Sequence, residues 1–437
     1  MTYLFPPILS AIISRSSILL ILLVAAKLLT PGEFDVYALI ATVAAIVNAL
    51  VSGGGDMWLN RFTPQSYAKV RPPPHIWFVY LSLSLIMAAA TFALGAGAVL
   101  LFDPLPGYAG PFILALAGAC LAGMTETMLA VIRSAGNLFV FFSVRDVATP
   151  VAYLAAILII GPATANGVIE IYTLVWLAAF LVTLFLLAQE IALSASTINL
   201  RWSAWKPVGR HTASLVYGNF TARFASYFDI LVLSAVALGI VGEYRVAAQL
   251  AIGFIVIQHF IFLGLPWELR AIGQHGEKGA GFAQVMTRQR ALIPLAAFGL
   301  VLGLLLAKPL LGWLGDGFVE VVPVLHLLLL VRFADLLWGP QHEVLVSNGR
   351  AIEDAHANML SVPVWAGAFI LFRLTSLPDI CAIVGATAVA AAGAQAIRLY
   401  FLHRAGLPSV FGHPLGAFLP LSLTALVLVG CGFYLYG

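Results

Sequence analysis

Residues 76–102 read IWFVYLSLSLIMAAATFALGAGAVLLF and contain no charged side chain. A helix needs about 20 apolar residues to cross the hydrocarbon core of a bilayer, so this stretch is long enough to span a membrane. Similar runs, separated by Gly, Pro or charge clusters, predict about thirteen spanning helices in all. The others lie at 5–29, 34–60, 110–133, 143–162, 168–192, 212–238, 243–265, 290–312, 318–341, 355–374, 378–403 and 414–436.

The composition agrees with a polytopic all-α membrane protein. Hydrophobic residues make up 62% of the chain and charged residues 9%, whereas a soluble domain has about 25% charged residues. The net charge of +3 gives no reason to expect a nucleic-acid partner. The sequence contains no Walker-type phosphate loop, no HExxH and no GxSxG, so we expect no cofactor, no metal site and no enzymatic activity.

Basic residues alternate between successive loops, and loops retained in the cytoplasm are enriched in Lys and Arg. This rule predicts a cytoplasmic N-terminus in a bacterial inner membrane. The opposite side holds only Lys27, Arg245, Lys308 and Arg373. The side predicted to be cytoplasmic includes Arg61, Lys69, Arg71, Arg133, Arg201, Lys206, Arg210, Arg270, Arg288, Arg290, Arg350 and Arg398.

An internal repeat is visible between the two halves of the chain. Residues 32–36, Gly-Glu-Phe-Asp-Val, return 210 positions later as Gly-Glu-Tyr-Arg-Val at 242–246. Each copy opens an even-numbered helix, so the two halves would have the same orientation, as in transporters that bind their substrate between two lobes. The predicted domains are an N-terminal lobe at 1–200, a C-terminal lobe at 201–405, and an additional helix at 406–437.

The sequence around both copies resembles a known family. Residues 26–38, AKLLTPGEFDVYA, are similar to the opening of Wzx-like polysaccharide (O-antigen) flippases of the multidrug/oligosaccharidyl-lipid/polysaccharide (MOP) exporter superfamily, with departures at Lys27, Thr30 and Asp35. Residues 229–233, DILVL, followed by GEYRVAAQ at 242–249, resemble the second half. The resemblance implies two six-helix lobes around a central cavity. It also implies movement of an undecaprenyl-diphosphate-linked oligosaccharide from the cytoplasmic to the periplasmic leaflet.

Arginines within the apolar segments are the first candidates for a binding site, because a charge deep in a bilayer normally faces a cavity or a partner. Arg15 lies roughly 15 Å along the first helix. Asn219, Arg223 and Ser226 share one face of the seventh segment. A guanidinium group binds phosphate oxygens with paired hydrogen bonds, so Arg15 and Arg223 are predicted to bind a diphosphate. A structural ion pair is the alternative for Arg15.

Arg332 is a further candidate for the cationic cavity, although Asp335 stands three positions later and a local ion pair is the simpler account. Asp229 points about 120° away from Arg223 on an ideal helix, so these two are not expected to pair. Asp229, Glu126 and Asp335 are candidates for coupling transport to an ion, and the alternative for each is a hydrogen-bonded packing role. Gly53, Gly54 and Gly55 are a candidate hinge, with simple fraying of the helix end as the alternative.

These observations leave three functional hypotheses. The first is a flippase for lipid-linked oligosaccharides that works by alternating access, with membrane lipids, a polymerase and other polysaccharide-assembly proteins as partners. The second is a cation-coupled multidrug exporter with the same fold, for which buried carboxylates would matter more than buried arginines. The third is a membrane polysaccharide polymerase or ligase, which is disfavoured because no large loop is predicted outside the cytoplasm.

Overall fold

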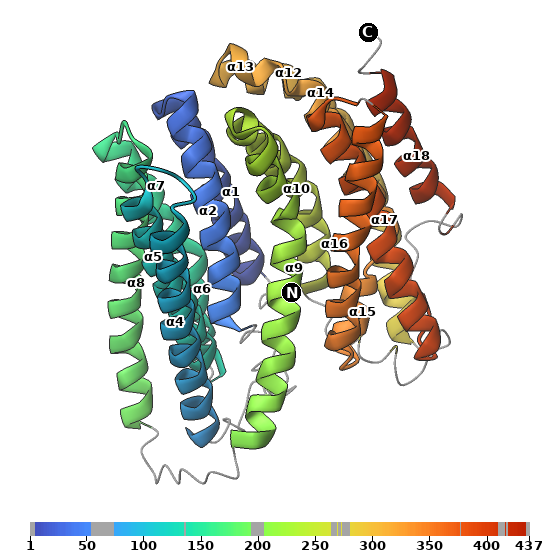
Figure 1. Ribbon diagram of the computed structural model, residues 1–437. Helices are drawn as coiled ribbons and strands as arrows, with labels where there is room; N and C mark the ends of the chain where they lie inside the picture. Colours follow the sequence, from blue (N-terminus) through green and yellow to red (C-terminus); the bar gives the residue numbers. More distant parts are fainter. Residues whose placement is uncertain are drawn as a thin grey trace. The chain divides into compact units, whose positions relative to one another are not determined.

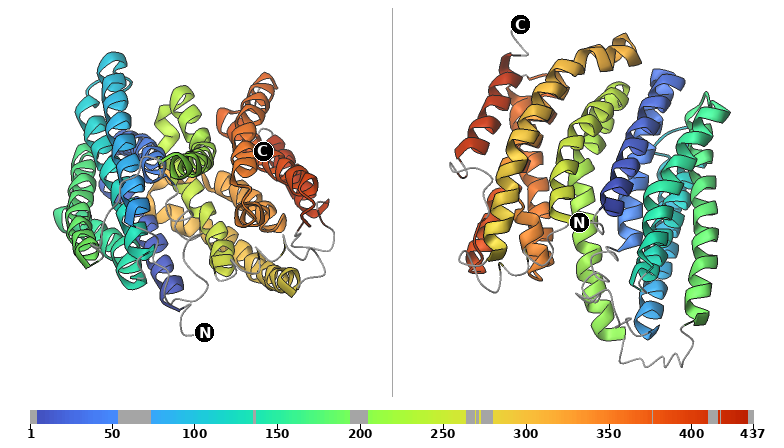
Figure 2. Two further views of the ribbon diagram at one scale, coloured as in Figure 1. Left: turned by 90° about the horizontal axis from the view of Figure 1, so that it is seen from below. Right: turned by 180° about the vertical axis from the view of Figure 1, so that it is seen from behind.

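The structure, a computed structural model, describes residues 5–53, 74–134, 137–193, 205–263, 269, 272, 280–375, 377–409, 416 and 418–433. Within these ranges every regular element is a helix and no strand occurs, which confirms the predicted all-α class. The long helices of each unit run broadly alongside one another (Figures 1 and 2). Within the described ranges, each apolar run found in the sequence overlaps a helix or a series of helices.

Two compact units make up the chain, Met1–Phe224 and Ala225–Gly437. The helices of the first unit are α1 (Phe5–Leu28), α2 (Pro31–Ser52), α4 (Pro74–Phe102), α5 (Ala109–Ser134), α6 (Leu138–Phe142), η1 (Ser143–Ala148), α7 (Thr149–Ile160) and α8 (Ala165–Leu193). Those of the second are η3 (Leu238–Ile240), α10 (Val241–Leu263), α12 (Ala280–Leu314), α13 (Asp316–Val319), α14 (Val322–Leu337), α15 (Gln341–Ser347), α16 (Ala351–Leu374), α17 (Asp379–Arg404) and α18 (Phe418–Phe433).

The division between the units falls inside α9 (Trp205–Val236). The first half of α9 belongs to the first unit because it contacts α2. The Asn219 amide donates hydrogen bonds to the Ala49 carbonyl (2.8 Å) and to the Ser52 hydroxyl (3.3 Å). The lobe bounds at 200 and 405 remain predictions.

A central helix organises each unit, and the pattern of its neighbours repeats. In the first unit α5 packs along α2, α4 and α8, and in the second unit α14 packs along α10, α12 and α17. These helices correspond in chain order, so the structure confirms the repeat that the two Gly-Glu motifs indicate. The additional helix α18 packs on α14 and α17.

The glutamate of each motif contacts the segment that precedes the central helix. Glu33 accepts hydrogen bonds from the Tyr108 hydroxyl (2.9 Å) and from the backbone N–H of Ala165 (2.7 Å), the first residue of α8. The hydrogen bond to the Glu33 carboxylate raises the pKa of Tyr108. In the second unit, a Cβ atom at Gly317, on the short helix before α14, would lie 3.8 Å from Glu243 Oε1. The motif therefore joins neighbouring helix ends in both units.

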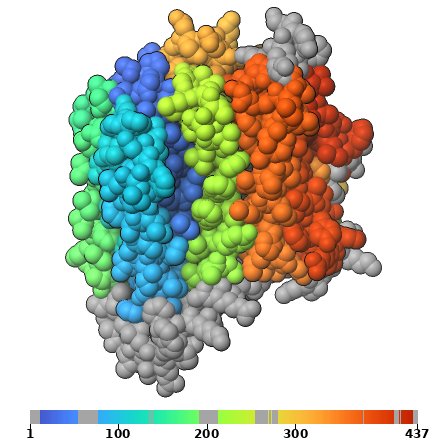
Figure 3. Space-filling model, viewed as in Figure 1, coloured from blue at the N-terminus to red at the C-terminus, as the bar shows by residue number. Residues whose placement is uncertain are grey.

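Large apolar side chains on the outside of the units show that this is a multi-pass membrane protein. Leu94, Leu101 and Phe102 on α4 are 76%, 81% and 78% exposed, and Figure 3 shows α4, in light blue, at the surface of the first unit. Water would oppose such exposure, whereas lipid tails solvate these side chains.

The described residues include eight helices long and apolar enough to cross a membrane, or up to nine if α14 and α15 form one span bent by 47°. The α18 helix is shorter than these. The count of about thirteen spans, including the one at 414–436, therefore remains a prediction.

Two of the predicted continuous helices, 143–162 and 318–341, are interrupted. The segment before Pro150 forms the π-helix η1, because proline lacks an N–H and its ring clashes with the carbonyl four residues earlier, which disturbs regular α-helical bonding. The run at 318–341 is divided at residues 320–321 between α13 and α14, and near its end Gly339, whose φ is 80°, and Pro340 separate α14 from α15.

Close packing between α5 and α2 makes Gly123 sensitive to substitution. A Cβ atom at Gly123 would lie 2.6 Å from Val51 Cβ and 3.0 Å from the Ser52 backbone nitrogen. We expect Gly123→Ala to lower the free energy of unfolding by about 1–3 kcal/mol, because helix backbone must move to accommodate the methyl group. Thermal unfolding of the purified protein in detergent would measure this.

The matched control for this prediction is Gly97→Ala on α4, where nothing lies within 4 Å of the added Cβ. This variant should be as stable as the wild type or slightly more so, because alanine favours helix by about 1 kcal/mol over glycine. Equal thermal stability of the two variants would show that the α2–α5 contact tolerates the extra methyl group.

Candidate functional site

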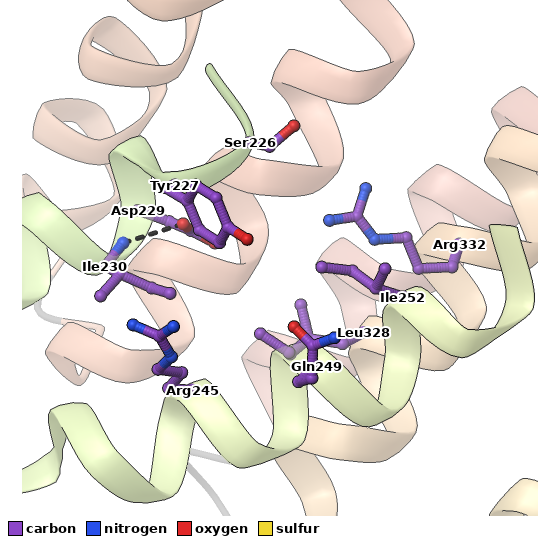
Figure 4. Close-up of a pocket in the computed structure, with 10 residues that line it drawn as sticks. Ser226, Tyr227, Asp229, Ile230, Arg245, Gln249, Ile252, Leu328 and Arg332 are labelled. Atoms are coloured by element: carbon purple, nitrogen blue, oxygen red, sulfur yellow. Dashed lines mark hydrogen bonds between the residues drawn. The ribbon is translucent and has the colours of Figure 1, made fainter. Parts of the chain in front are cut away.

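The candidate site is a cleft within the second unit, between α9, α10 and α14 (Figure 4). It brings together three of the predicted site residues, because Ser226 and Asp229 on α9 meet Arg332 from the distant helix α14. Its lining is Ser226, Tyr227, Asp229, Ile230, Arg245, Ala248, Gln249, Ile252, Leu328 and Arg332.

The Asp229 carboxylate has two hydrogen-bond donors. It is 6% exposed, its Oδ1 atom accepts the backbone N–H of Ile230 (2.8 Å), and its Oδ2 atom accepts the Tyr244 hydroxyl (2.6 Å). The Tyr244 hydroxyl also hydrogen-bonds with the Thr387 side chain on α17. The indole N–H of Trp365 donates to Thr387 Oγ1 (3.0 Å). Asp229 therefore belongs to a polar network that joins α9, α10, α16 and α17.

Arg332 enters the same cleft from α14 and is half-buried. Its Nε atom is buried, and among the described residues it has no hydrogen-bond partner. No described ion pair joins Arg332 to Asp335, because the Asp335 carboxylate accepts a hydrogen bond from Gln395 on α17 instead (2.6 Å). The simpler account considered for Arg332, a local pair, is therefore wrong.

Arg245 and Gln249 add further donors from α10. Figure 4 shows the guanidinium groups of Arg245 and Arg332 on either side of Gln249. Two guanidinium groups supply planar, permanently charged donors and the amide N–H₂ group adds a neutral one, which is the chemistry that binds phosphate or carboxylate oxygens. From the sequence, Arg245 is only counted among the charges on the side opposite to the cytoplasm and is not a predicted site residue. The signal that could have placed it in the site is the repeated motif that contains it.

A second polar cluster, unrelated to any predicted site, lies between α15, α16 and α17. Asp354 on α16 is 2% exposed, and its carboxylate accepts from Arg398 Nε (2.7 Å) and Asn358 Nδ2 (3.2 Å). His342 Nδ1 lies 2.7 Å from Asp354 Oδ2, the same oxygen that accepts from Asn358. Arg398 also donates to Asn358 Oδ1 (2.5 Å). These side chains satisfy one another, so we regard the cluster as structural.

Other predicted residues lie in the first unit. Glu126 on α5 accepts a hydrogen bond from the Asn48 amide of α2 (3.2 Å), and Asn219 bonds to α2 as described above. Arg15 on α1 and Arg223 on α9 have exposed side chains. Their proposed roles in binding or coupling remain predictions, and so does the proposed coupling role of Asp335 in the second unit.

The predicted glycine hinge falls partly outside the described residues. Gly53 caps the C-terminus of α2 with φ 59° and ψ 19°, a left-handed conformation that glycine adopts without strain. Its position faces Val216 of α9, since an added Cβ atom would lie 3.1 Å from Val216 Cγ2. Gly54 and Gly55 lie outside the described residues, and the hinge remains a prediction. Across the described part of the chain, no group of three His, Cys, Asp or Glu side chains could hold a metal ion.

No protein-family model and no curated protein sequence matches this chain. Solved structures do match it. An inward-facing multidrug resistance MATE family transporter of the MOP superfamily has a TM-score of 0.66 and 12% sequence identity, and the match covers 94% of each chain. A mutant of the Vibrio cholerae MATE transporter VcmN has a TM-score of 0.60 and 16% identity, over 92% of this chain and 95% of that one.

A eukaryotic MATE transporter, AtDTX14, matches with a TM-score of 0.61 and 11% identity, over 97% of this chain and 98% of that one. At such low identity, the likeness shows the fold and not the cargo. The helix order, the repeat and the comparisons agree on one conclusion, which is that this membrane protein has the fold of MATE transporters of the MOP superfamily.

Proposed function

We propose that this protein is a flippase that moves an undecaprenyl-diphosphate-linked oligosaccharide from the cytoplasmic to the periplasmic leaflet by alternating access, for polysaccharide biosynthesis. The shared fold supports a transporter. MATE structures with this fold have been solved in both inward-facing and outward-facing conformations, so the fold is compatible with alternating access.

The observation that carries the choice of cargo is the cationic cleft of the second unit. Arg332 has a buried Nε atom without a partner in the described structure, and Arg245 lines the same cleft. A buried, unsatisfied donor on a charged group costs free energy, so such a group is retained where a ligand completes its hydrogen bonds. A diphosphate supplies the matching acceptor oxygens and the opposite charge.

The second candidate is a cation-coupled multidrug exporter. Matching structures are described as multidrug transporters, and the buried carboxylates Asp229 and Glu126 are the groups that would attract a cation. In the structure both carboxylates already accept hydrogen bonds, from Tyr244 and Asn48 respectively. Among the described residues that line the cleft, Arg332 has a buried donor atom, Nε, without a hydrogen-bond partner, which favours an anionic cargo.

Binding of farnesyl diphosphate to the purified protein tests this proposal. This compound is a short, soluble isoprenoid with the same anionic group. We expect Arg332→Gln to weaken its binding by about 10- to 100-fold, because a hydrogen bond to a charged group contributes about 1.5–3 kcal/mol. Isothermal titration calorimetry would measure the dissociation constants.

Two controls accompany the measurement. Arg290→Gln on α12 removes an exposed arginine outside the cleft and should bind as the wild type does. Farnesol, which lacks the diphosphate, should bind weakly to every variant. The multidrug exporter would be supported instead if the protein bound the lipophilic cation tetraphenylphosphonium and not farnesyl diphosphate. In that case Asp229→Asn should abolish binding of the cation.

A further inference from the structure

We propose that Tyr244 determines the anion selectivity of the cleft, because its hydroxyl holds the Asp229 carboxylate and so prevents that carboxylate from pairing with Arg332. The Arg332 guanidinium then stays available to a phosphate-bearing ligand. The identity of that ligand rests on the proposed function, whereas the role of Tyr244 as a positioning residue can be tested without it.

A buried carboxylate and a half-buried guanidinium, whose Nε atom is buried, share the cleft without an ion pair between them. Asp229 and Arg332 both line it, and the Arg332 charge acts on the Asp229 carboxylate. Ordinarily two such groups would pair, because each is costly to bury alone. No ion pair between Asp229 and Arg332 is found among the described residues, so another interaction must keep Asp229 away from Arg332.

That interaction is the short hydrogen bond from Tyr244. Its hydroxyl lies 2.6 Å from Asp229 Oδ2, while the other carboxylate oxygen accepts the Ile230 N–H. The Tyr244 side chain is 0% exposed, and the Thr387 side chain lies beside its hydroxyl. Because the ring cannot move aside, Asp229 is fixed in the orientation seen in Figure 4.

The first copy of the repeat provides an internal comparison. The position that corresponds to Tyr244 is Phe34, which has no hydroxyl, and residues 19–21, at the place that corresponds to Asp229, are Leu-Leu-Ile. The carboxylate and the hydroxyl therefore occur together in the second copy and are both missing from the first. This is expected if the hydroxyl is present to hold the carboxylate, since a fold requirement alone would be met by phenylalanine.

A stability measurement tests the inference without any cargo. The experiment uses two sets of variants, one in the wild-type background and one in the Tyr244→Phe background. Each set consists of Asp229→Asn, Arg332→Gln and the double variant. The thermal unfolding midpoints of all variants are then compared. In the wild type we expect only a small coupling between the two changes, because the two charges share the cleft without forming an ion pair. In Tyr244→Phe we expect a coupling of roughly 2–4 °C or more, because the released carboxylate pairs with Arg332.

A binding measurement gives a second readout. Tyr244→Phe should weaken farnesyl diphosphate binding about tenfold, which corresponds to loss of one charge-assisted hydrogen bond. Tyr244→Phe/Asp229→Asn should recover most of that affinity, because the competing carboxylate is gone. Tyr80→Phe is the matched control, since it removes a buried tyrosine hydrogen bond to a backbone carbonyl in the first unit (2.8 Å) and should not affect binding.

The outcomes separate this inference from the proposed function. A wild type that does not bind farnesyl diphosphate would contradict the proposed cargo, and the stability cycle would still decide the role of Tyr244. Equal coupling between Asp229 and Arg332 in both backgrounds would overturn the inference. Strong coupling in the wild type would overturn it as well, even if Tyr244→Phe failed to fold. The inference would also be overturned if Tyr244→Phe bound farnesyl diphosphate as tightly as the wild type does.

Discussion

Replacement of Arg223 by alanine is expected to abolish transport of the lipid-linked oligosaccharide while leaving the protein inserted in the membrane. Arg223 lies well inside the long helix α9, and its side chain is exposed. No hydrogen bond or ion pair of Arg223 is seen in the described part of the chain. An exposed arginine at such depth faces water rather than lipid, because lipid would impose a cost of at least 2.5–3.5 kcal/mol by a rough estimate. Removing it should therefore affect the cargo more than the packing.

Complementation of a flippase-deficient strain, with membrane levels checked by immunoblot, measures this effect. Arg223→Lys should retain part of the activity, because lysine keeps the charge but loses the planar pair of donors that fits a phosphate. Arg290→Ala, which removes an exposed arginine of α12, serves as the control and should complement fully. Full complementation by Arg223→Ala at a normal protein level would instead favour a structural role for this side chain.

Most of the helices were predictable from the sequence because the apolar runs are long and uninterrupted by charge. The run at 76–102 corresponds to α4 at Pro74–Phe102, and the run at 110–133 to α5 at Ala109–Ser134. The breaks were missed because apolar residues flank each of them. Hydropathy alone does not register the N–H that Pro150 and Pro340 lack, nor the positive φ of Gly339.

The partners of the charged residues were less predictable, because helical spacing reveals only neighbours within one helix. It suggested that Arg332 pairs with Asp335, three positions away. In the structure Asp335 accepts from Gln395, a contact that spans 60 positions. Likewise Arg398 was counted only as a charge on the side predicted to be cytoplasmic, yet it bonds to Asp354, 44 positions earlier. Such contacts depend on which helices pack together, and the sequence pattern does not contain that information.

The Asp354 cluster provides the largest expected effect on stability. Asp354→Leu would leave the Arg398 guanidinium, whose side chain is 11% exposed, without its carboxylate partner. Breaking a buried ion pair in this way typically costs about 3–5 kcal/mol, a large part of the total stability of about 5–15 kcal/mol that a folded protein has. We therefore expect little monodisperse protein by fluorescence-detected size-exclusion chromatography after mild heating.

The exposed pair Arg373–Asp379 offers a matched control, because its atoms are 2.9 Å apart but the side chains are 49% and 28% exposed. Asp379→Leu should cost less than about 1 kcal/mol, since water solvates the remaining charge. A second change, Arg398→Met in the Asp354→Leu background, should recover stability by removing the unpaired charge. If Asp354→Leu were as stable as Asp379→Leu, water would have to reach Arg398, and this region of the second unit would be a hydrated path rather than a packed interior.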